Sequence, residues 1–330
     1  MTNLDYLKNL NSEQKKAVIT TDGPLLVVAG AGSGKTRVLT SKIVYLIKEK
    51  KIIPNQILSV TFTNKAASEM QNRVIKMLKS SSKGLPWLGT FHSICAKLLR
   101  KHARSVGLNS NFTIIDTDDQ VRLIKNICKS ENIDTKKLSP KVILSIIDRW
   151  KNKGYYPEKV IINKKDIYEK TILPIYKIYQ KKLLDLNACD FGDLILHCVE
   201  MLQKDAGIQE IYTNNFKYIL VDEYQDTNFI QGKWLNLLTG KNNNICCVGD
   251  DDQSIYSWRG AEIKNFLDFD KIYEDTKIIR LEENYRSTQN ILSVASDLIA
   301  NNQNRVGKDL KTNLQDGELV KLNCFKNGKD

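Results

Sequence analysis

The sequence lacks long hydrophobic runs, a leader-like start and cysteines at metal-binding spacing, and each absence excludes a class of protein. The longest unbroken apolar runs have about five residues, far fewer than the roughly 20 that a membrane-spanning helix needs. The stretch from Met1 to Lys16 is polar and contains no apolar core of a signal peptide. The seven cysteines show no metal-binding spacing. We therefore expect a cytoplasmic protein with reduced, mostly structural thiols and no membrane partner.

What the sequence does have is an ordinary globular composition with an excess of positive charge. Among its 330 residues, hydrophobic types make up 42% and charged types 27%, as in most globular proteins. This length leaves room for about two domains. The net charge of +12 favours a polyanionic partner such as nucleic acid. A coding bias towards lysine and asparagine would give the same charge, and charge alone does not separate the two explanations.

The most informative stretch is 25–36, where an apolar run typical of a buried strand leads into a glycine-rich turn and then a helical pattern. The turn consists of Ala29, Gly30, Ala31, Gly32, Ser33, Gly34, Lys35 and Thr36. Glycines let backbone N–H groups approach an anion, and the helix N-terminus adds the positive end of its dipole. We therefore predict a phosphate cradle in which Lys35 reaches the β- and γ-phosphates and Thr36 holds Mg²⁺. The strict pattern has glycine where Ala29 stands, so a plain strand-to-helix turn stays open at this point.

Four short apolar runs predict buried strands of a mostly parallel sheet, and helical patterns lie between them. The runs are residues 25–29, 57–62, 218–221 and 245–248. This alternation is typical of a doubly wound α/β domain. Cys246 and Cys247 fall in the last run, so we expect their side chains on opposite faces of the sheet.

A helical block between about 112 and 190 interrupts this alternation. Thr117 and Gln120 have the spacing of a capping box. Ser139 followed by Pro140 is typical of a helix start with proline in the first turn. The block therefore predicts a helical insertion carried on the α/β domain.

Two carboxylates, Asp222 and Glu223, directly follow the third apolar run. A magnesium–nucleotide site needs a carboxylate at a strand end for the metal and a base for the attacking water. Because side chains alternate along a strand, we expect these two on opposite faces, where one pair can serve both roles. An ordinary acidic strand-to-turn junction is the alternative, and the phosphate loop upstream argues against it.

Polar and aromatic residues also follow two later strands. Gln253 at a strand end can hydrogen-bond a γ-phosphate, while Tyr256 and Trp258, with Arg259 beside them, offer stacking planes to unpaired bases. A core or interface aromatic is the open alternative for Trp258. Arg286 can act as a finger on the γ-phosphate, a role worth roughly 10³–10⁵ in rate where it has been measured. Taken alone, it fits an ordinary surface ion pair better.

With these residues in place, the chain resembles the superfamily 1A DNA helicases of the UvrD/Rep/PcrA family over essentially its whole length. The segments that carry the resemblance are 10–14, 29–36, 61–67, 89–93, 190–194, 221–228, 249–261 and 281–287. Alanine is a usual variant in the family where Ala29 stands, which removes the departure noted above. The family usually has aspartate where Gly192 stands. The resemblance implies an α/β, RecA-like P-loop NTPase fold with an inserted helical subdomain and the start of a second RecA-like domain. The implied ranges are 1–111 and 191–276 for the first domain, 112–190 for the insertion and 277–330 for the second domain.

The resemblance also implies roles for single residues in the nucleotide site. Gln14 would read the adenine edge, Arg37 would lie near the base or sugar, and Tyr285 would stack on the adenine. The phosphate loop, with Lys35 as a catalytic cation, would hold the phosphates.

In the same resemblance, Thr36 and Asp222 would bind Mg²⁺ and Glu223 would be the general base. Gln253 would sense the γ-phosphate and Arg286 would be an arginine finger. The residues implied to contact single-stranded DNA are Phe62, Asn64, Thr90, His92, Tyr256, Trp258 and Arg259. A core histidine with satisfied hydrogen bonds stays open for His92.

The function implied by the resemblance is that of an ATP-dependent 3′–5′ DNA helicase or translocase in repair or replication restart. Its cofactors would be ATP and Mg²⁺, and its partners single-stranded DNA and single-strand/duplex junctions. The family's later motifs do not follow Arg286, so we expect ATP and DNA binding with weak ATPase activity and no processive unwinding. Two alternatives are a nucleotide-dependent single-stranded DNA binding module without turnover and the motor part of an AddA/RecB-like helicase–nuclease.

Overall fold

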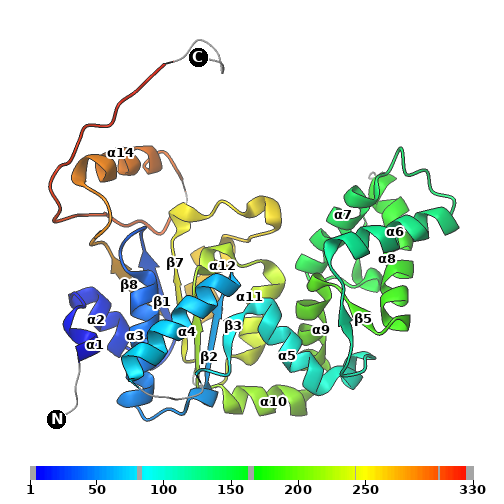
Figure 1. The fold of residues 1–330 in the computed structure, drawn as a ribbon, viewed down its shortest axis with the longest axis horizontal. Coiled ribbons are helices and arrows are strands. Elements are labelled where there is room, and N and C mark those ends of the chain that lie inside the picture. Colours follow the sequence, from blue (N-terminus) through cyan, green and yellow to red (C-terminus); the bar gives the residue numbers. More distant parts are fainter. Residues whose placement is uncertain (1–4, 80–83, 163–166, 242, 304, 325–330) are drawn as a thin grey trace.

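The computed structural model describes residues 5–79, 84–162, 167–241, 243–303 and 305–324, and the ends of the predicted domain ranges at 1–4 and 325–330 lie outside them. Its centre is a six-stranded sheet in which every pairing is parallel (Figure 1). In spatial order its strands are β3 (Leu88–Thr90), β2 (Ile57–Thr61), β6 (Tyr218–Val221), β7 (Ile245–Gly249), β1 (Leu25–Ala29) and β8 (Lys277–Leu281). All four predicted runs are confirmed as strands, with end points that differ by at most one residue.

Alternate residues of the strands contribute to two hydrophobic cores, one on each face of the sheet. Cys246 belongs to one core and Cys247 to the other, which confirms the expected alternation. The first core is covered by α2 (Ser12–Ile19), α3 (Lys35–Lys48) and α4 (Asn64–Leu78), beside the short α1 (Asp5–Lys8). The second is covered by α5 (Phe91–His102), α9 (Phe191–Lys204), α11 (Phe229–Leu238), α12 (Lys264–Leu267) and α13 (Phe269–Ile272), with α10 (Ala206–Asn215) against α9 and α11. The predicted doubly wound α/β fold is confirmed.

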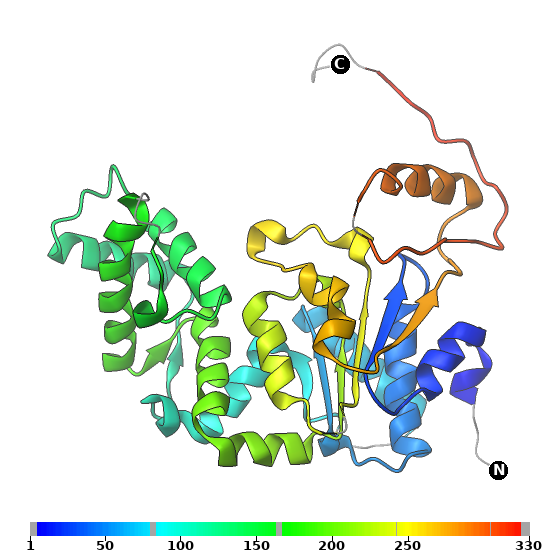
Figure 2. The same ribbon diagram turned by 180° about the vertical axis from the view of Figure 1, so that it is seen from behind.

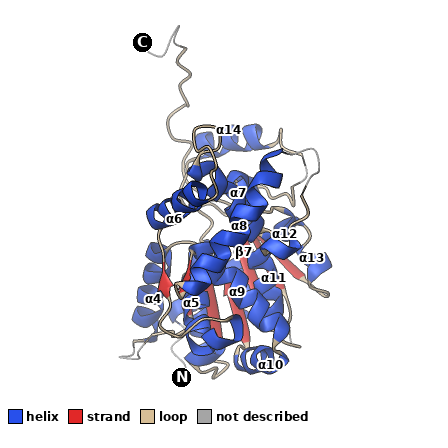
Figure 3. Ribbon diagram, turned by 90° about the vertical axis from the view of Figure 1, so that its right-hand side faces the viewer, coloured by secondary structure: helices blue, strands red, loops and turns tan. Residues whose placement is uncertain are grey.

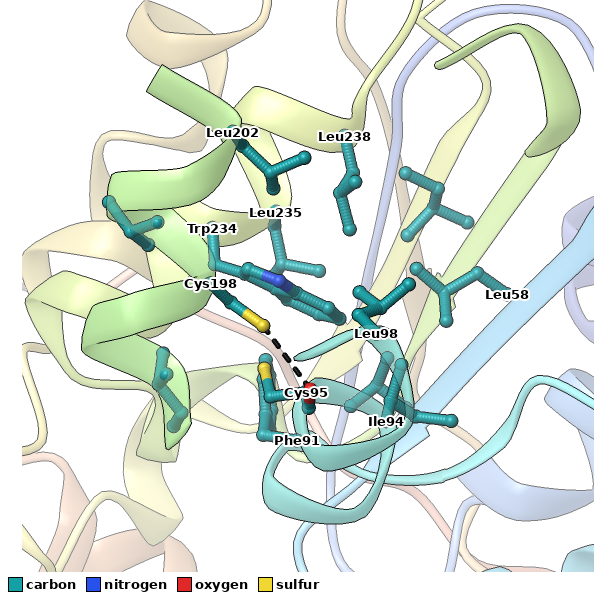
Figure 4. Packing of buried hydrophobic residues seen from close by; sticks show 14 of the residues in the cluster. Leu58, Phe91, Ile94, Cys95, Leu98, Cys198, Leu202, Trp234, Leu235 and Leu238 are labelled. Carbon is teal, nitrogen blue, oxygen red and sulfur yellow. Dashed lines mark hydrogen bonds between the residues drawn. The ribbon is translucent and has the colours of Figure 1, made fainter. Parts of the chain in front are cut away.

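Trp234 lies in the middle of the second core (Figure 4). Its ring centre is 5.8 Å from that of Phe91 in an edge-to-face arrangement, which is a preferred geometry for aromatic pairs. Beside it, the Cys198 thiol donates to the Cys95 carbonyl oxygen at 3.3 Å and so joins α9 to α5. All seven cysteines are free and six of them are buried, as expected for structural thiols.

The predicted helical insertion is present, and its helices α6 (Thr117–Ser130), α7 (Pro140–Asn152) and α8 (Ile167–Asp185) lie together (Figure 3). It has a hydrophobic core of its own, and β4 (Thr113–Ile114) pairs with β5 (Ala188–Cys189) where the chain enters and leaves the insertion. The predicted start of α7 at Pro140 is confirmed, with Ser139 as its cap. The predicted capping box at Thr117 is wrong, because the Asp116 carboxylate accepts from the backbone of Asp119 and makes Thr117 the first helical residue.

A buried ionic cluster joins the insertion to the sheet unit. Lys151 of α7 has no exposed side-chain surface, and its Nζ lies 2.6 Å from Asp190 Oδ2 and 2.7 Å from Asp193 Oδ1. Tyr179 and Gln180 of α8 each donate to one of these carboxylates at 2.9 Å. Asp190 caps α9 at the same time, so the cluster fixes two insertion helices, α7 and α8, to one helix of the sheet unit.

The last described part of the chain lies at the carboxyl end of the sheet. β8 pairs along the whole of β1, so a domain boundary at 277 would cut the sheet, and we propose that it falls after Leu281. Beyond that residue, α14 (Gln289–Ile299) and the segment 305–311 lie above the strand ends (Figure 2). Among the described residues, no helix is both long enough and apolar enough to span a bilayer.

Candidate nucleotide site and nucleic-acid interface

The turn between β1 and α3 is shaped as a phosphate loop. Gly32 and Gly34 have φ angles of 71° and 90°, a left-handed conformation that favours glycine. A Cβ at Gly34 would lie 2.7 Å from Gln14 Nε2, and one at Gly30 would lie 2.5 Å from a methyl group of Leu310. The loop therefore needs small residues both for its backbone conformation and because side chains press on it from two sides.

Gln14 fixes the phosphate loop to the start of α2. Its side chain is buried, its Oε1 accepts from the backbone of Asn11 at 3.2 Å, and its Nε2 donates to the Ser33 carbonyl at 2.8 Å. Asn11 caps the same helix in return. The structure thus gives Gln14 a role in the loop that sequence reasoning missed, and its contact with adenine stays a prediction.

Lys35, Asp222 and Glu223 meet at the carboxyl end of the sheet. Lys35 Nζ lies 3.7 Å from Glu223 Oε2. β6 ends at Val221, and Glu223 has a φ of 50°, so a left-handed turn places its side chain and the predicted strand alternation does not apply. Such strain in a non-glycine residue is typical of functional sites.

The Asp222 carboxylate fits a cation ligand. It is buried, and burial together with the neighbouring Glu223 raises its pKa to about 7, although Lys35 opposes the shift. A buried carboxylate whose charge is only partly compensated is stabilised by a divalent cation beside it. Asp222 therefore has the chemistry that the predicted Mg²⁺ site requires. Thr36, the other predicted Mg²⁺ ligand, is the second residue of α3.

The predicted base and the predicted γ-phosphate sensor are connected through Gln225 and Asp250. Gln225 Nε2 donates to Glu223 Oε2 at 2.8 Å, and Gln225 Oε1 accepts from the backbone of Asp250 at 3.0 Å. Gln253 in turn donates its side-chain N–H to the Asp250 carboxylate. The ends of β6 and β7 are therefore tied together beside the phosphate loop.

The segment that carries Tyr285 and Arg286 is bound directly to the phosphate loop. Asn284 Nδ2 donates to the Ala31 carbonyl at 2.6 Å, and the Tyr285 backbone donates to the Gly32 carbonyl at 3.0 Å. Asn284 Oδ1 accepts from the backbone of Arg286 at 2.8 Å. Asn284, which sequence reasoning missed, thus places the predicted arginine finger next to the loop.

Tyr285 and Arg37 lie together at the α2 side of the loop. The Tyr285 hydroxyl accepts from Asn11 Nδ2 at 2.8 Å, and the residue is 46% exposed. Arg37 donates to the carbonyl of Asn9 at 3.4 Å. Stacking of Tyr285 on the adenine stays a prediction.

A cavity of about 430 Å³ separates the sheet unit from the insertion, and it gathers many of the predicted DNA contacts. Phe62, His92, Tyr256 and Arg259 line it, together with residues of the insertion. Its complete lining is Phe62, Thr63, His92, Thr117, Gln120, Asp148, Asn152, Phe191, Gly192, Asp226, Asn228, Gln231, Tyr256, Arg259 and Ala261. The insertion therefore contributes to the same surface as the sheet unit.

His92 and Phe191 form an aromatic pair in this cavity. Their ring centres are 5.9 Å apart in an edge-to-face arrangement. Burial lowers the pKa of His92, so its imidazole is neutral at pH 7. His92 is half-buried and lines the cavity, and its contact with DNA stays a prediction. Sequence reasoning missed Phe191, which is 48% exposed. An aromatic residue directly after the Asp190 cap of α9 was the available signal.

The other predicted DNA contacts lie outside the cavity lining. Thr90 is buried, and its hydroxyl accepts from the backbone of Ser93 at 3.2 Å, so it caps α5. Asn64 is exposed at the start of α4. Trp258 is 73% exposed, which excludes the core reading within this chain.

Trp258, Tyr256 and Arg259 form a group on the surface, called the Trp258 group below, in which the arginine lies over two tilted aromatic rings. The two aromatic ring centres are 6.4 Å apart. The Arg259 guanidinium carbon lies 4.6 Å from the ring centre of Trp258 and 5.2 Å from that of Tyr256. Exposed aromatic faces with a cation beside them are the arrangement on which unpaired bases stack.

A parallel sheet with a glycine-rich loop after β1 and paired carboxylates after β6 defines an α/β fold of the RecA-like P-loop class. Residues 10–274 match the family described as UvrD/REP helicase N-terminal domain, and residues 279–330 match the UvrD-like helicase C-terminal domain. The chain belongs to the UvrD/REP helicase family.

Named relatives agree with this assignment. The chain is 49% identical to the probable DNA helicase II homolog of Rickettsia conorii over 325 residues, which are 98% of this chain and 49% of the relative. It is 47% identical to the ATP-dependent DNA helicase PcrA of Staphylococcus epidermidis over 314 residues, which are 95% of this chain and 43% of the relative. The chain spans about half the length of these relatives.

Proposed function

We propose that this chain provides the nucleotide-binding part of an ATP-dependent 3′–5′ DNA helicase or translocase that moves on single-stranded DNA. The observation that carries this proposal is the approach of Lys35 Nζ to within 3.7 Å of Glu223 Oε2. It brings a phosphate-binding cation and a general base together beside a glycine loop. The names of the relatives, DNA helicase II and ATP-dependent DNA helicase PcrA, support the DNA substrate. The polarity and a setting in repair or replication restart rest on the family resemblance.

In the proposed reaction, the loop N–H groups and Lys35 bind the β- and γ-phosphates of ATP. Thr36 and Asp222 would hold Mg²⁺, which supplies positive charge against the phosphates. Glu223 accepts a proton from the water that attacks the γ-phosphorus, and the bond to the β-phosphate oxygen breaks to leave ADP and phosphate. Arg286 stabilises the charge on the transferred group.

Single-stranded DNA would bind across the surface that joins the cavity to the Trp258 group. Phe62, Tyr256 and Trp258 offer ring faces to bases, and Arg259 offers a positive charge to the backbone. Asn64, Thr90 and His92 would be further DNA contacts, as the family resemblance implies. The first RecA-like domain would comprise 1–111 and 191–281, with 112–190 as the insertion and the later residues as the start of the second domain.

Trp258→Ala is expected to weaken binding of a single-stranded oligonucleotide by about 1–3 kcal/mol, because it removes one stacking face. Fluorescence anisotropy with a labelled oligonucleotide measures the effect. The slope of log affinity against log salt should stay unchanged, because stacking neutralises no phosphate and releases no counterions.

Ile211→Ala is the matched control, because Ile211 is also an exposed apolar residue, 57% exposed, but lies on α10 and not in the cavity lining. It should bind the oligonucleotide as the unmodified chain does. Equal affinities of Trp258→Ala and the unmodified chain would exclude Trp258 from the DNA surface.

A further inference from the structure

The segment 305–311 returns over the strand ends and places a lysine among three carboxylates. Lys308 is largely buried, and its Nζ lies 2.6 Å from Asp250 Oδ1, 3.3 Å from Asp251 Oδ1 and 2.5 Å from Asp252 Oδ2. Arg305 from the same segment pairs with Asp252 at 2.6 Å. Residues more than 50 positions apart in the sequence therefore meet at the turn after β7.

Lys308 places a positive charge where three such carboxylates could otherwise bind a metal ion. Within the described part of the chain, Asp250, Asp251 and Asp252 are the one group of three acidic side chains whose ligand atoms all lie within 4.8 Å of one another. Burial by itself lowers the pKa of Lys308, but hydrogen bonds and attraction from the carboxylates, Asp250 first, raise it overall. The ammonium group is therefore charged at pH 7.

The carboxylate of Asp250 connects this lysine to the predicted γ-phosphate sensor. Its Oδ1 is held by Lys308, and its Oδ2 accepts from Gln253 Nε2. Its backbone N–H donates to Gln225, which also donates to Glu223. A change in the position of Asp250 would thus reach both the sensor and the base.

We propose that Lys308 is a positioning residue that fixes the Gln253 amide through Asp250 in the orientation that recognises a γ-phosphate. This inference rests on the proposed function. Without Lys308, Arg305 is the one cation of the described residues that still pairs with the three adjacent carboxylates, which then repel one another more strongly. Asp250 Oδ1 keeps the backbone N–H of Asp252 at 3.2 Å and loses its charged partner. Because Lys308 lies downstream of Arg286, it also ties the sensor to the segment that follows the predicted arginine finger.

The test is the preference of the 330-residue chain for ATPγS over ADP, measured as the ratio of the two dissociation constants by titration calorimetry. We expect the unmodified chain to prefer ATPγS by about tenfold or more, since a hydrogen bond to a charged group has at least that effect. Lys308→Met and Gln253→Ala should each lower this preference by about tenfold, the effect of one hydrogen bond to a charged group, because Lys35 and Arg286 keep their own predicted contacts with the γ-phosphate. The affinity for ADP, which lacks the γ-phosphate, should not change. The double variant should lose no more than either single one, because both act on one contact.

Three further variants make the test specific. Lys311→Met removes the same charge from an exposed position in the same segment and should keep the preference. Lys308→Arg should retain part of it. Asp250→Asn should lose the preference that depends on Gln253. If Lys308→Met is unfolded and binds no ADP, the result for Asp250→Asn tests the positioning role instead.

The outcomes separate the two proposals. If Lys308→Met binds ADP normally and keeps the full preference, or if the losses of the two single variants multiply in the double variant, the positioning role is wrong while the proposed function stands. If the unmodified chain binds neither nucleotide, the proposed function is wrong and this inference falls with it.

Discussion

Lys35→Ala lowers the affinity of the chain for ATP by about 100-fold or more. The lysine ammonium is predicted to contact both the β- and γ-phosphates, and each hydrogen bond between charged groups is worth about 1.5–3 kcal/mol. The substitution also removes the cation 3.7 Å from Glu223 and leaves that carboxylate to repel the phosphates. Titration calorimetry with MgATP measures the loss.

Lys50→Ala is the control for Lys35→Ala. Lys50 is exposed just beyond the other end of α3, so its loss changes the net charge equally without touching the loop. It should bind ATP as the unmodified chain does. Retained ATP affinity in Lys35→Ala would contradict the assignment of the phosphate loop.

Lys151→Met lowers the free energy of unfolding by about 3–5 kcal/mol, because it leaves Asp190 and Asp193 buried without their cation. Methionine fills a similar volume, so little of the loss comes from a cavity. Urea denaturation followed by tryptophan fluorescence reports it, since Trp150 lies next to the substituted residue. Lys141→Met, an exposed position in the first turn of α7, should change the free energy of unfolding by less than about 0.5 kcal/mol.

Adding Asp190→Asn and Asp193→Asn to Lys151→Met should restore part of the stability, because the buried charges are then removed together. Asparagine at 190 can still cap α9. A Lys151→Met chain as stable as the Lys141→Met control would show that the cluster does not hold the insertion to the sheet unit.

Local patterns in the sequence predicted the parts of the fold that depend on local forces. The apolar runs became strands because five-residue apolar stretches are buried on both faces of a parallel sheet. The glycine loop followed because Gly32 and Gly34 adopt φ angles that other residues avoid. The helix start at Pro140 followed from its fixed φ angle.

Tertiary contacts decided what the sequence could not predict. Asn284 and Lys308 have no distinctive local pattern, and their roles arise because the chain returns to the phosphate loop and to Asp250 from distant positions. The pairing of β8 with β1 is equally long-range. An acidic run such as 250–252 at a buried strand end does call for a counter-charge, but the sequence does not say which lysine supplies it.

The placement of Glu223 shows the same limit at the candidate site. Alternation along a strand predicted its direction, but the strand ends two residues earlier and a φ of 50° turns the chain. A positive φ in a glutamate has no sequence signal. In the folded chain the Gln225 amide, which also accepts from the Asp250 backbone, donates to the Glu223 carboxylate.

The most direct test of the account is the rate of ATP hydrolysis by the purified 330-residue chain, with and without single-stranded DNA, beside Glu223→Gln. We predict weak turnover that DNA stimulates and that Glu223→Gln abolishes while ATP still binds, because the glutamine cannot accept the proton of the attacking water. Turnover that is unchanged in Glu223→Gln, or that does not respond to DNA, would contradict the proposed coupling of hydrolysis to the DNA surface.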